Sequence, residues 1–143
     1  MSMARNSVIT LMVAALVSSI SFAADNTYNY ISAPELESRL KDQQTINIID
    51  IQVENEFTQK HIKGAEPTYA YPVKKATDRV KLDAAVKRLK SNSDPVVIVC
   101  PRGAGGARRT FDYLLEQGIT FERLLILEKG QQGWTCEELT EKM

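Results

Sequence analysis

Cys100 is the residue of this sequence with the clearest capacity for chemistry. It closes the apolar, β-branched run 95–99, which is typical of a buried strand. A helix is expected to begin within a turn or two, at about Ala107. The loop between them is rich in glycine and consists of Pro101, Arg102, Gly103, Ala104, Gly105 and Gly106. A strand, a glycine-rich loop and a helix in this order direct several backbone N–H groups at one place, which is the geometry of an anion-binding site.

A cysteine in such a site is predicted to be reactive. The amino end of the helix and the nearby cations Arg102, Arg108 and Arg109 favour the thiolate, which is the nucleophilic form of the side chain. The same site would stabilise a persulfide anion on Cys100, because glycines let the backbone approach without Cβ clashes. The alternative interpretation is structural, with Cys100 as a small buried apolar residue at the end of a strand.

Three further side chains are candidates for accessory roles. Asp50 ends another β-branched apolar run, and we expect it to order the neighbouring loop rather than to act in catalysis. His61 precedes a turn, where we expect it to bind loop carbonyl groups. Cys136 either resolves a persulfide or sulfenate on Cys100 as a disulfide or is a packed or exposed thiol. We favour the second interpretation of Cys136, since the sequence does not give the distance between the cysteines.

Alternating helices and strands must position these residues. Helices are expected at 32–41, 81–90 and 107–117, and strands at 45–51, 68–71, 95–100 and 123–127. The segment from His61 to Ala65 is expected to be a turn. This alternation predicts an α/β fold with a parallel sheet that is covered by helices on both faces.

Length and composition indicate one domain and exclude some kinds of partner. The chain has 143 residues, of which 43% are hydrophobic, and this suits a single core. Eighteen Lys and Arg residues balance eighteen Asp and Glu residues. No field of one sign therefore attracts nucleic acid or an anionic membrane surface.

The first 23 residues have the pattern of a secretory signal peptide. Arg5 precedes an apolar run at 8–20, and small residues follow at Ser21 and Ala23. Cleavage is expected after Ala23, or alternatively after Ala24, which leaves residues 24–143 as one periplasmic domain without membrane association. An uncleaved membrane anchor is the other interpretation, but the apolar run is shorter than the roughly 20 residues that a spanning helix needs.

Three segments together resemble the rhodanese-like domain family. They are Asp50-Ile51-Gln52 through Glu56-Phe57 to His61-Ile62-Lys63-Gly64-Ala65, then Val96 to Gly103, and finally Gly130-Gln131-Gln132-Gly133-Trp134. Their order and spacing cover nearly all of the predicted mature chain. The resemblance implies a parallel five-stranded sheet flanked by helices on both faces.

The resemblance also implies a reaction. In a sulfurtransferase of this family, Cys100 would take sulfane sulfur from thiosulfate or a persulfide donor and hold it as a persulfide in the loop 101–106. It would then pass the sulfur to a thiol or to cyanide. Arg102 would attract the anionic donor, backbone amides would supply most of the stabilisation, and no metal or organic cofactor would be needed. The rival hypotheses are a module that binds or delivers sulfur to a periplasmic partner protein, and a sensor switched by a Cys100–Cys136 disulfide.

The sequence departs from the family pattern near the predicted site. Family members that use thiosulfate commonly carry Arg, Lys or Thr five positions after the cysteine, where this chain has Gly105. Arg102 is one substitute for the missing cation, and Arg108 or Arg109 reaching back from the helix is another. Related phosphatases and arsenate reductases need an arginine about six positions after the cysteine, and Gly106 at that position disfavours their chemistry.

Two further departures are expected to be structural. Gln52 replaces the arginine that is common in the family, which removes an ion pair with an acidic neighbour such as Glu56, and Lys60 replaces the glycine before His61.

Overall fold

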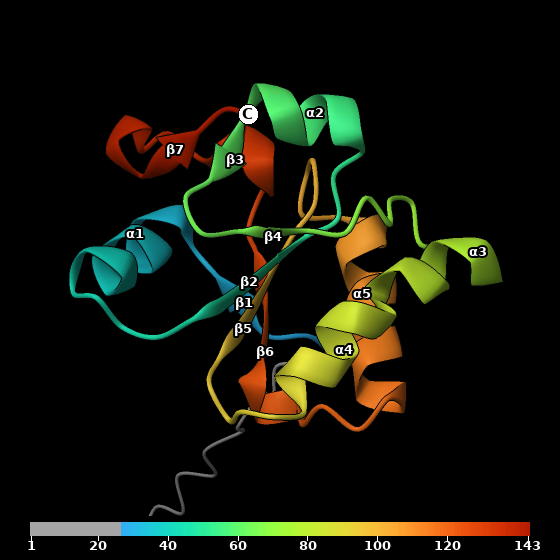
Figure 1. The fold of residues 1–143 in the computed structure, drawn as a ribbon. Helices are drawn as coiled ribbons and strands as arrows, with labels where there is room; N and C mark the ends of the chain where they lie inside the picture. The colour runs from blue at the N-terminus through green and yellow to red at the C-terminus, as the bar shows by residue number, and fades with distance from the viewer. Residues whose placement is uncertain (1–26) are drawn as a thin grey trace, which may run out of the picture.

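Five short parallel strands form the centre of the computed structural model, which describes residues 27–143 (Figure 1). All neighbouring strands of this sheet run in the same direction. Their order across the sheet is β1 (Tyr30–Ile31), β6 (Leu124–Leu127), β5 (Val96–Val99), β2 (Asn47–Asp50) and β4 (Glu66–Pro67). The predicted α/β fold with a parallel five-stranded sheet is confirmed.

Helices cover both faces of the sheet (Figure 1). The helix α1 (Ala33–Lys41) lies on one face, whereas α4 (Asp83–Leu89) and α5 (Gly105–Glu116) lie on the other. The central strand β5 is buried from both sides, which explains why its sequence is apolar at every position rather than alternating. Val97 and Val99 pack in the cluster that contains Leu36 of α1. Val96, Ile98 and Cys100 belong to the cluster beneath α4 and α5, so the Cys100 side chain faces α5.

The remaining elements are short. They are the helices α2 (Glu54–Gln59) and α3 (Ala76–Arg79), an antiparallel pair formed by β3 (His61–Ile62) and β7 (Thr140–Glu141), and 3-10 turns at Val80–Leu82, Phe121–Arg123, Gln131–Gly133 and Glu137–Leu139. The predicted helix at 32–41 is confirmed as α1, and Ser32 caps it, since its Oγ accepts a hydrogen bond from the Glu35 amide at 3.3 Å.

Two sequence predictions near the sheet edge are wrong. The predicted strand at 68–71 does not form, and the edge strand is β4, two residues earlier in the chain. Tyr69 adopts a left-handed backbone with φ of 55°, which breaks an extended strand at this point. His61 and Ile62 were expected in a turn but pair with β7, a contact with the C-terminal segment that local sequence does not reveal.

The loop after Cys100 is shorter than predicted. α5 begins at Gly105 rather than near Ala107, and the Arg108 amide donates to the Ala104 carbonyl oxygen at 3.1 Å. The low helix propensity of glycine suggested a later start. Gly105 and Gly106 therefore form the first turn of the helix, and only Pro101–Ala104 connect it to the strand.

The predicted signal peptide lies outside the described residues. Within residues 27–143, no helix is long and apolar enough to cross a membrane.

Candidate active site

Cys100 lies directly after the carboxyl end of β5. Its side chain is 2% exposed, and its Sγ accepts a hydrogen bond from the Gly103 amide at 3.0 Å. The loop thus curls around the sulfur atom and aims a backbone N–H at it. An amide donor in this position stabilises negative charge on sulfur.

The loop keeps this shape because it packs backbone against backbone on the turn after β6. Gly103 has φ of 69°, and a Cβ there would lie 2.6 Å from the Leu127 carbonyl oxygen. Gly130 has φ of 56°, and a Cβ there would overlap the Cys100 carbonyl oxygen and lie 2.6 Å from the Gly103 nitrogen. Both glycines are therefore required for their backbone conformation and for the close approach.

Two hydrogen bonds also hold the loop after Cys100 against the turn after β6. The Gln131 amide donates to the Cys100 carbonyl oxygen at 2.8 Å, and the Gln132 amide donates to the Pro101 carbonyl oxygen at 3.0 Å. The two carbonyl groups at the start of the loop are thus hydrogen-bonded to the turn that follows β6.

The amino end of α5 faces this loop without a cap. The N-cap residue is Ala104, whose methyl side chain cannot accept a hydrogen bond. Within residues 27–143, the first-turn amides of Gly105, Gly106 and Ala107 have no hydrogen-bond partner. These donors and the positive end of the helix dipole lie next to Cys100 and suit an anion.

The three arginines singled out in the sequence lie in different places. Arg102 is exposed and makes no hydrogen bond or ion pair within the described part of the chain. Arg108 is directed toward β1, where its Nε donates to Tyr30 Oη at 3.3 Å and its guanidinium lies 5.9 Å from the centre of the Tyr28 ring. Arg108 is thus engaged away from the loop.

Arg109 is the arginine that reaches back to the start of α5. Its Nη1 lies 2.9 Å from the point where a Cβ on Gly105 would be. Its Nε donates to the Pro72 carbonyl oxygen at 2.9 Å. The guanidinium is therefore held over the first turn of the helix.

Tyr71 is a residue of the site that sequence reasoning missed. A Cβ on Gly106 would lie 3.0 Å from the Tyr71 ring, so this half-exposed ring covers the second residue of α5. The segment was predicted as a strand. The Tyr71-Pro72 dipeptide is a local signal for a loop instead, because proline disfavours a continuing strand.

Asp50 lies at the same sheet edge as Cys100 but on the other face. It pairs in register with Val99, whose side chain points toward α1. Its carboxylate accepts hydrogen bonds from the Gln52 amide at 2.8 Å and from Gln52 Nε2 at 3.0 Å. Burial raises the pKa of Asp50 to about 6, although the two bonds from Gln52 oppose that change. Asp50 and Gln52 together shape the loop after β2.

His61 is buried and makes local contacts. Its Nδ1 lies 2.8 Å from the Phe57 carbonyl oxygen, and its ring stacks on the Phe57 ring at 3.9 Å. A carbonyl oxygen only accepts hydrogen bonds, so Nδ1 carries a proton. Nε2 lies 3.7 Å from a carboxylate oxygen of Glu141 in β7.

The structure does not bring Cys136 to Cys100. Both cysteines are free, and they belong to the apolar clusters on opposite faces of the sheet. Cys136 is half-buried beside Glu37 and Lys41 of α1.

Comparison with known proteins identifies the family. Residues 32–137 match the Rhodanese-like domain family. This chain belongs to that family. The search of curated protein sequences found no significant match to this chain.

Solved structures with a similar fold carry different activities in their names. One is a yeast protein tyrosine phosphatase of the rhodanese family, with a TM-score of 0.64, 18% identity and coverage of 79% of this chain and 91% of that chain. A rhodanese-like domain protein from Staphylococcus aureus gives a TM-score of 0.57, 25% identity and coverage of 80% and 98%. A thiosulfate sulfurtransferase from Pseudomonas aeruginosa gives a TM-score of 0.58, 19% identity and coverage of 80% and 20%. The fold alone therefore leaves the reaction open.

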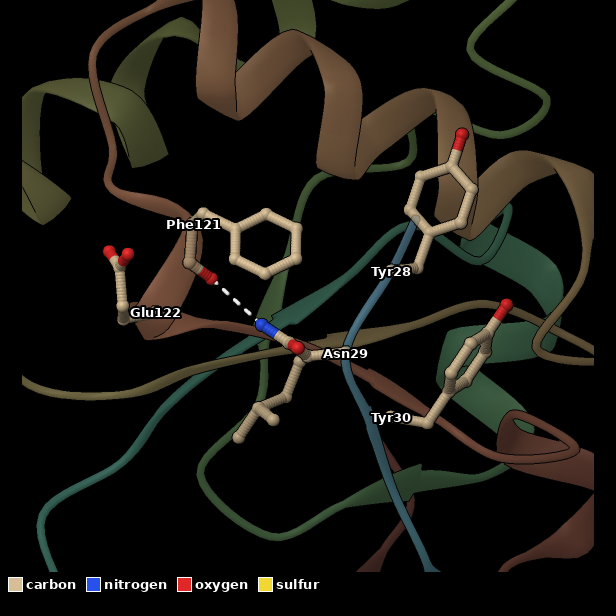
Figure 2. Close-up of a pocket in the computed structure, with 6 residues that line it drawn as sticks. Tyr28, Asn29, Tyr30, Phe121 and Glu122 are labelled. Carbon is tan, nitrogen blue, oxygen red and sulfur yellow. Dashed lines mark hydrogen bonds between the residues drawn. The ribbon is translucent and has the colours of Figure 1, made fainter. Parts of the chain in front are cut away.

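This rhodanese-like domain has a surface cavity of about 580 Å³ (Figure 2). Figure 2 shows its lining residues, which are Tyr28, Asn29, Tyr30, Phe121, Glu122 and Leu125. Most of them precede or begin β1 and β6, at the amino end of the parallel sheet. Because Cys100 follows the carboxyl end of β5, this cavity is not part of its site. Among the described residues, no group of His, Cys, Asp and Glu side chains is arranged to hold a metal ion.

Replacing Gly130 tests the backbone contact behind Cys100. Gly130→Ala is expected to lower the free energy of unfolding by more than about 2 kcal/mol, because its Cβ has no space and its φ is left-handed. Gly118→Ala is the matched control, since Gly118 also has a positive φ, of 92°, but nothing lies within 4 Å of its Cβ position. The control is expected to lose only about 1 kcal/mol. Equal losses in urea unfolding would contradict the assigned contact.

The buried carboxyl of Asp50 is expected to make stability fall as the pH rises. In the unfolded chain the Asp50 carboxyl has its ordinary pKa of 3.8, whereas in the folded domain its pKa is about 6. The free energy of unfolding therefore falls by up to about 3 kcal/mol between pH 4 and 7. Asp50→Asn removes this dependence, so the stability of the variant relative to the wild type should improve over that range.

Urea unfolding at several pH values between 4 and 7 measures this effect. Asp78→Asn is the control, because hydrogen bonds from the Lys75 and Lys74 amides lower the pKa of Asp78, so that this group stays ionised across the range and the pH profile of the variant should run parallel to that of the wild type. Parallel pH profiles for the wild type and Asp50→Asn would show that the Asp50 interpretation is wrong.

Proposed function

We propose that this rhodanese-like domain is a sulfurtransferase that moves sulfane sulfur from a donor to a thiol or cyanide through a persulfide on Cys100. The observation that carries the proposal is the hydrogen bond from the Gly103 amide to Cys100 Sγ at 3.0 Å. The sulfur atom is bound at the amino end of α5, where the first-turn amides have no partner within residues 27–143. Negative charge on sulfur is stabilised at such a place.

The proposed reaction consists of two displacements at sulfur. The Cys100 thiolate attacks the sulfane sulfur of a donor such as thiosulfate, the S–S bond of the donor breaks, and its electron pair leaves with sulfite. A persulfide anion remains on Cys100. A thiol or cyanide then attacks the outer sulfur atom and regenerates the Cys100 thiolate. Each step moves an electron pair from the nucleophile to the leaving group, so the reaction is balanced without an oxidant or reductant.

The glycines of the loop and helix start support the storage of the outer sulfur. Gly105 has no side chain that projects into the loop, and Gly106 lies beneath the Tyr71 ring. Backbone amides can therefore approach a persulfide anion without Cβ atoms in between.

Phosphate-ester hydrolysis is a second candidate activity, because one protein of this fold is named a tyrosine phosphatase. That chemistry needs an arginine about six positions after the cysteine, where this chain has Gly106. A side chain at this position would begin 3.0 Å from the Tyr71 ring and 3.2 Å from Cδ1 of Ile51. A side chain at position 106 would crowd the Tyr71 ring and Ile51, and the chain has no arginine there, so sulfur transfer is favoured.

Intact mass measured without reductant tests the persulfide. The wild-type residues 24–143 are expected to gain one sulfur atom on incubation with thiosulfate and to lose it on addition of cyanide. Cys100→Ser is expected to gain none, whereas Cys136→Ser should behave as the wild type, because the two cysteines lie on opposite faces of the sheet.

The other outcomes of the mass measurement have distinct meanings. No sulfur gain with thiosulfate or polysulfide would overturn the proposed reaction and favour a module that binds a partner protein. A mass lower by two hydrogen atoms in the untreated protein would favour a disulfide-switched sensor.

We also propose that the domain is exported to the periplasm, on the composition of residues 1–23. The full chain expressed in a bacterial host is expected in the periplasmic fraction with Ala24 as its first residue, or Asp25 if cleavage follows Ala24. A chain that lacks residues 2–23 is the control and should stay in the cytoplasm. Full-length protein in the membrane fraction would support an uncleaved anchor instead.

A further inference from the structure

The pair Gly105 and Arg109 places a guanidinium group over the first helical residue after the active-site loop. Residues four apart in a helix lie on the same face, and long helical side chains point toward the amino end. The Arg109 side chain follows this direction, and all three distances from its guanidinium to the Cβ position of Gly105 are short. Nη1 lies 2.9 Å, Cζ 3.5 Å and Nη2 3.5 Å from that point. The guanidinium occupies the space that a side chain at position 105 would fill.

We propose that Arg109 is the cation that binds the anionic end of the sulfur donor in this domain, an inference that rests on the proposed sulfur transfer. Family members that use thiosulfate commonly carry their cation at the position that is Gly105 here. In this chain the charge comes from the next turn of α5, and the absence of a side chain at Gly105 leaves room for it. The donor class that this arrangement fits carries an oxyanion next to its sulfane sulfur, as thiosulfate does.

The hydrogen bonds of Arg109 leave its terminal donors available. Nε donates to the Pro72 carbonyl oxygen at 2.9 Å, which fixes the side chain. Within residues 27–143, Nη1 and Nη2 have no hydrogen-bond partner, and no carboxylate forms an ion pair with them. An arginine held by Nε can still offer the N–H groups of both Nη atoms to an oxyanion.

The guanidinium and the helix amides act on the same region. Gly105, against which the guanidinium lies, is also the first helical residue, whose amide belongs to the uncapped end of α5. A sulfonate group at this place would receive N–H donors from Arg109 and from the helix start together. Charge-assisted donors of this kind are the stronger hydrogen bonds.

The other two arginines lack this arrangement. Arg108 is engaged by Tyr30 and lies over the Tyr28 ring. Arg102 is exposed, and no contact within the described residues holds it at the loop. Arg108 is a matched control for Arg109, since it is the neighbouring residue with the same charge on the same helix.

Steady-state kinetics with thiosulfate and cyanide test the proposal. Arg109→Gln is expected to raise KM for thiosulfate by about tenfold to a hundredfold, because charged hydrogen bonds to the donor are lost. The value of kcat should change by less than about threefold, since the Gly103 amide still serves the sulfur atom. Arg108→Gln should leave KM within about twofold of the wild type. In the Arg109→Gln background, Gly105→Lys is expected to restore part of the loss by returning a cation to the loop.

A binding measurement separates failure of this inference from failure of the proposed reaction. Thiosulfate titrated into Cys100→Ser protein, followed by calorimetry, should bind more weakly by the same factor when Arg109→Gln is added. Persulfide formation together with equal KM values for Arg109→Gln and Arg108→Gln would overturn the role of Arg109 and leave sulfur transfer intact. Loss of binding in the double variant without any persulfide in the wild type would retain the anion site and overturn the reaction.

Discussion

The active site depends on the close approach of two backbone segments. Gly103 and Gly130 let the loop after β5 and the turn after β6 pack without side chains between them. The Gln131 and Gln132 amides donate hydrogen bonds to the carbonyl groups at the start of the loop. In the loop held this way, the Gly103 amide points at Cys100 Sγ. An anion site is thus built from backbone that is already fixed before any ligand arrives.

Side chains alternate between the two faces of a sheet along each strand, and this alternation separates the Asp50 carboxyl from the Cys100 thiol at the carboxyl end of the sheet. Cys100 faces α5, whereas Asp50, in register with Val99, faces the side of α1. A carboxylate on the same face would repel a thiolate or persulfide anion. Asp50 instead interacts with Gln52 in the loop after β2. One edge of the sheet can therefore hold a buried carboxyl for structure and a sulfur nucleophile for chemistry without direct conflict between their charges.

Sequence reasoning predicted the parts of this fold that depend on local pattern. The apolar run before Cys100 and the helical patterns at 32–41 and 107–117 are local signals, and the structure has these elements near the expected residues. The strand predicted at 68–71 failed because Tyr69 takes a left-handed backbone that its residue type does not favour. The β3–β7 pair, the position of Tyr71 and the separation of the cysteines depend on contacts distant in sequence. Which arginine reaches the start of α5 also depended on such contacts, since Arg108 bonds to Tyr30 and Arg109 to the Pro72 carbonyl oxygen.

With the active-site cation on helix α5, the binding of an anionic donor depends on a second segment of the chain. A cation on the loop itself moves with the loop, whereas Arg109 is held by the Pro72 carbonyl oxygen in a separate segment. The segment with Tyr71 and Pro72 therefore contacts the site twice, through the ring over Gly106 and through this carbonyl group. Displacing this segment would release the guanidinium and uncover the helix start together. The affinity for an anionic donor in this domain thus reflects the packing of the chain after β4 as well as the loop after β5.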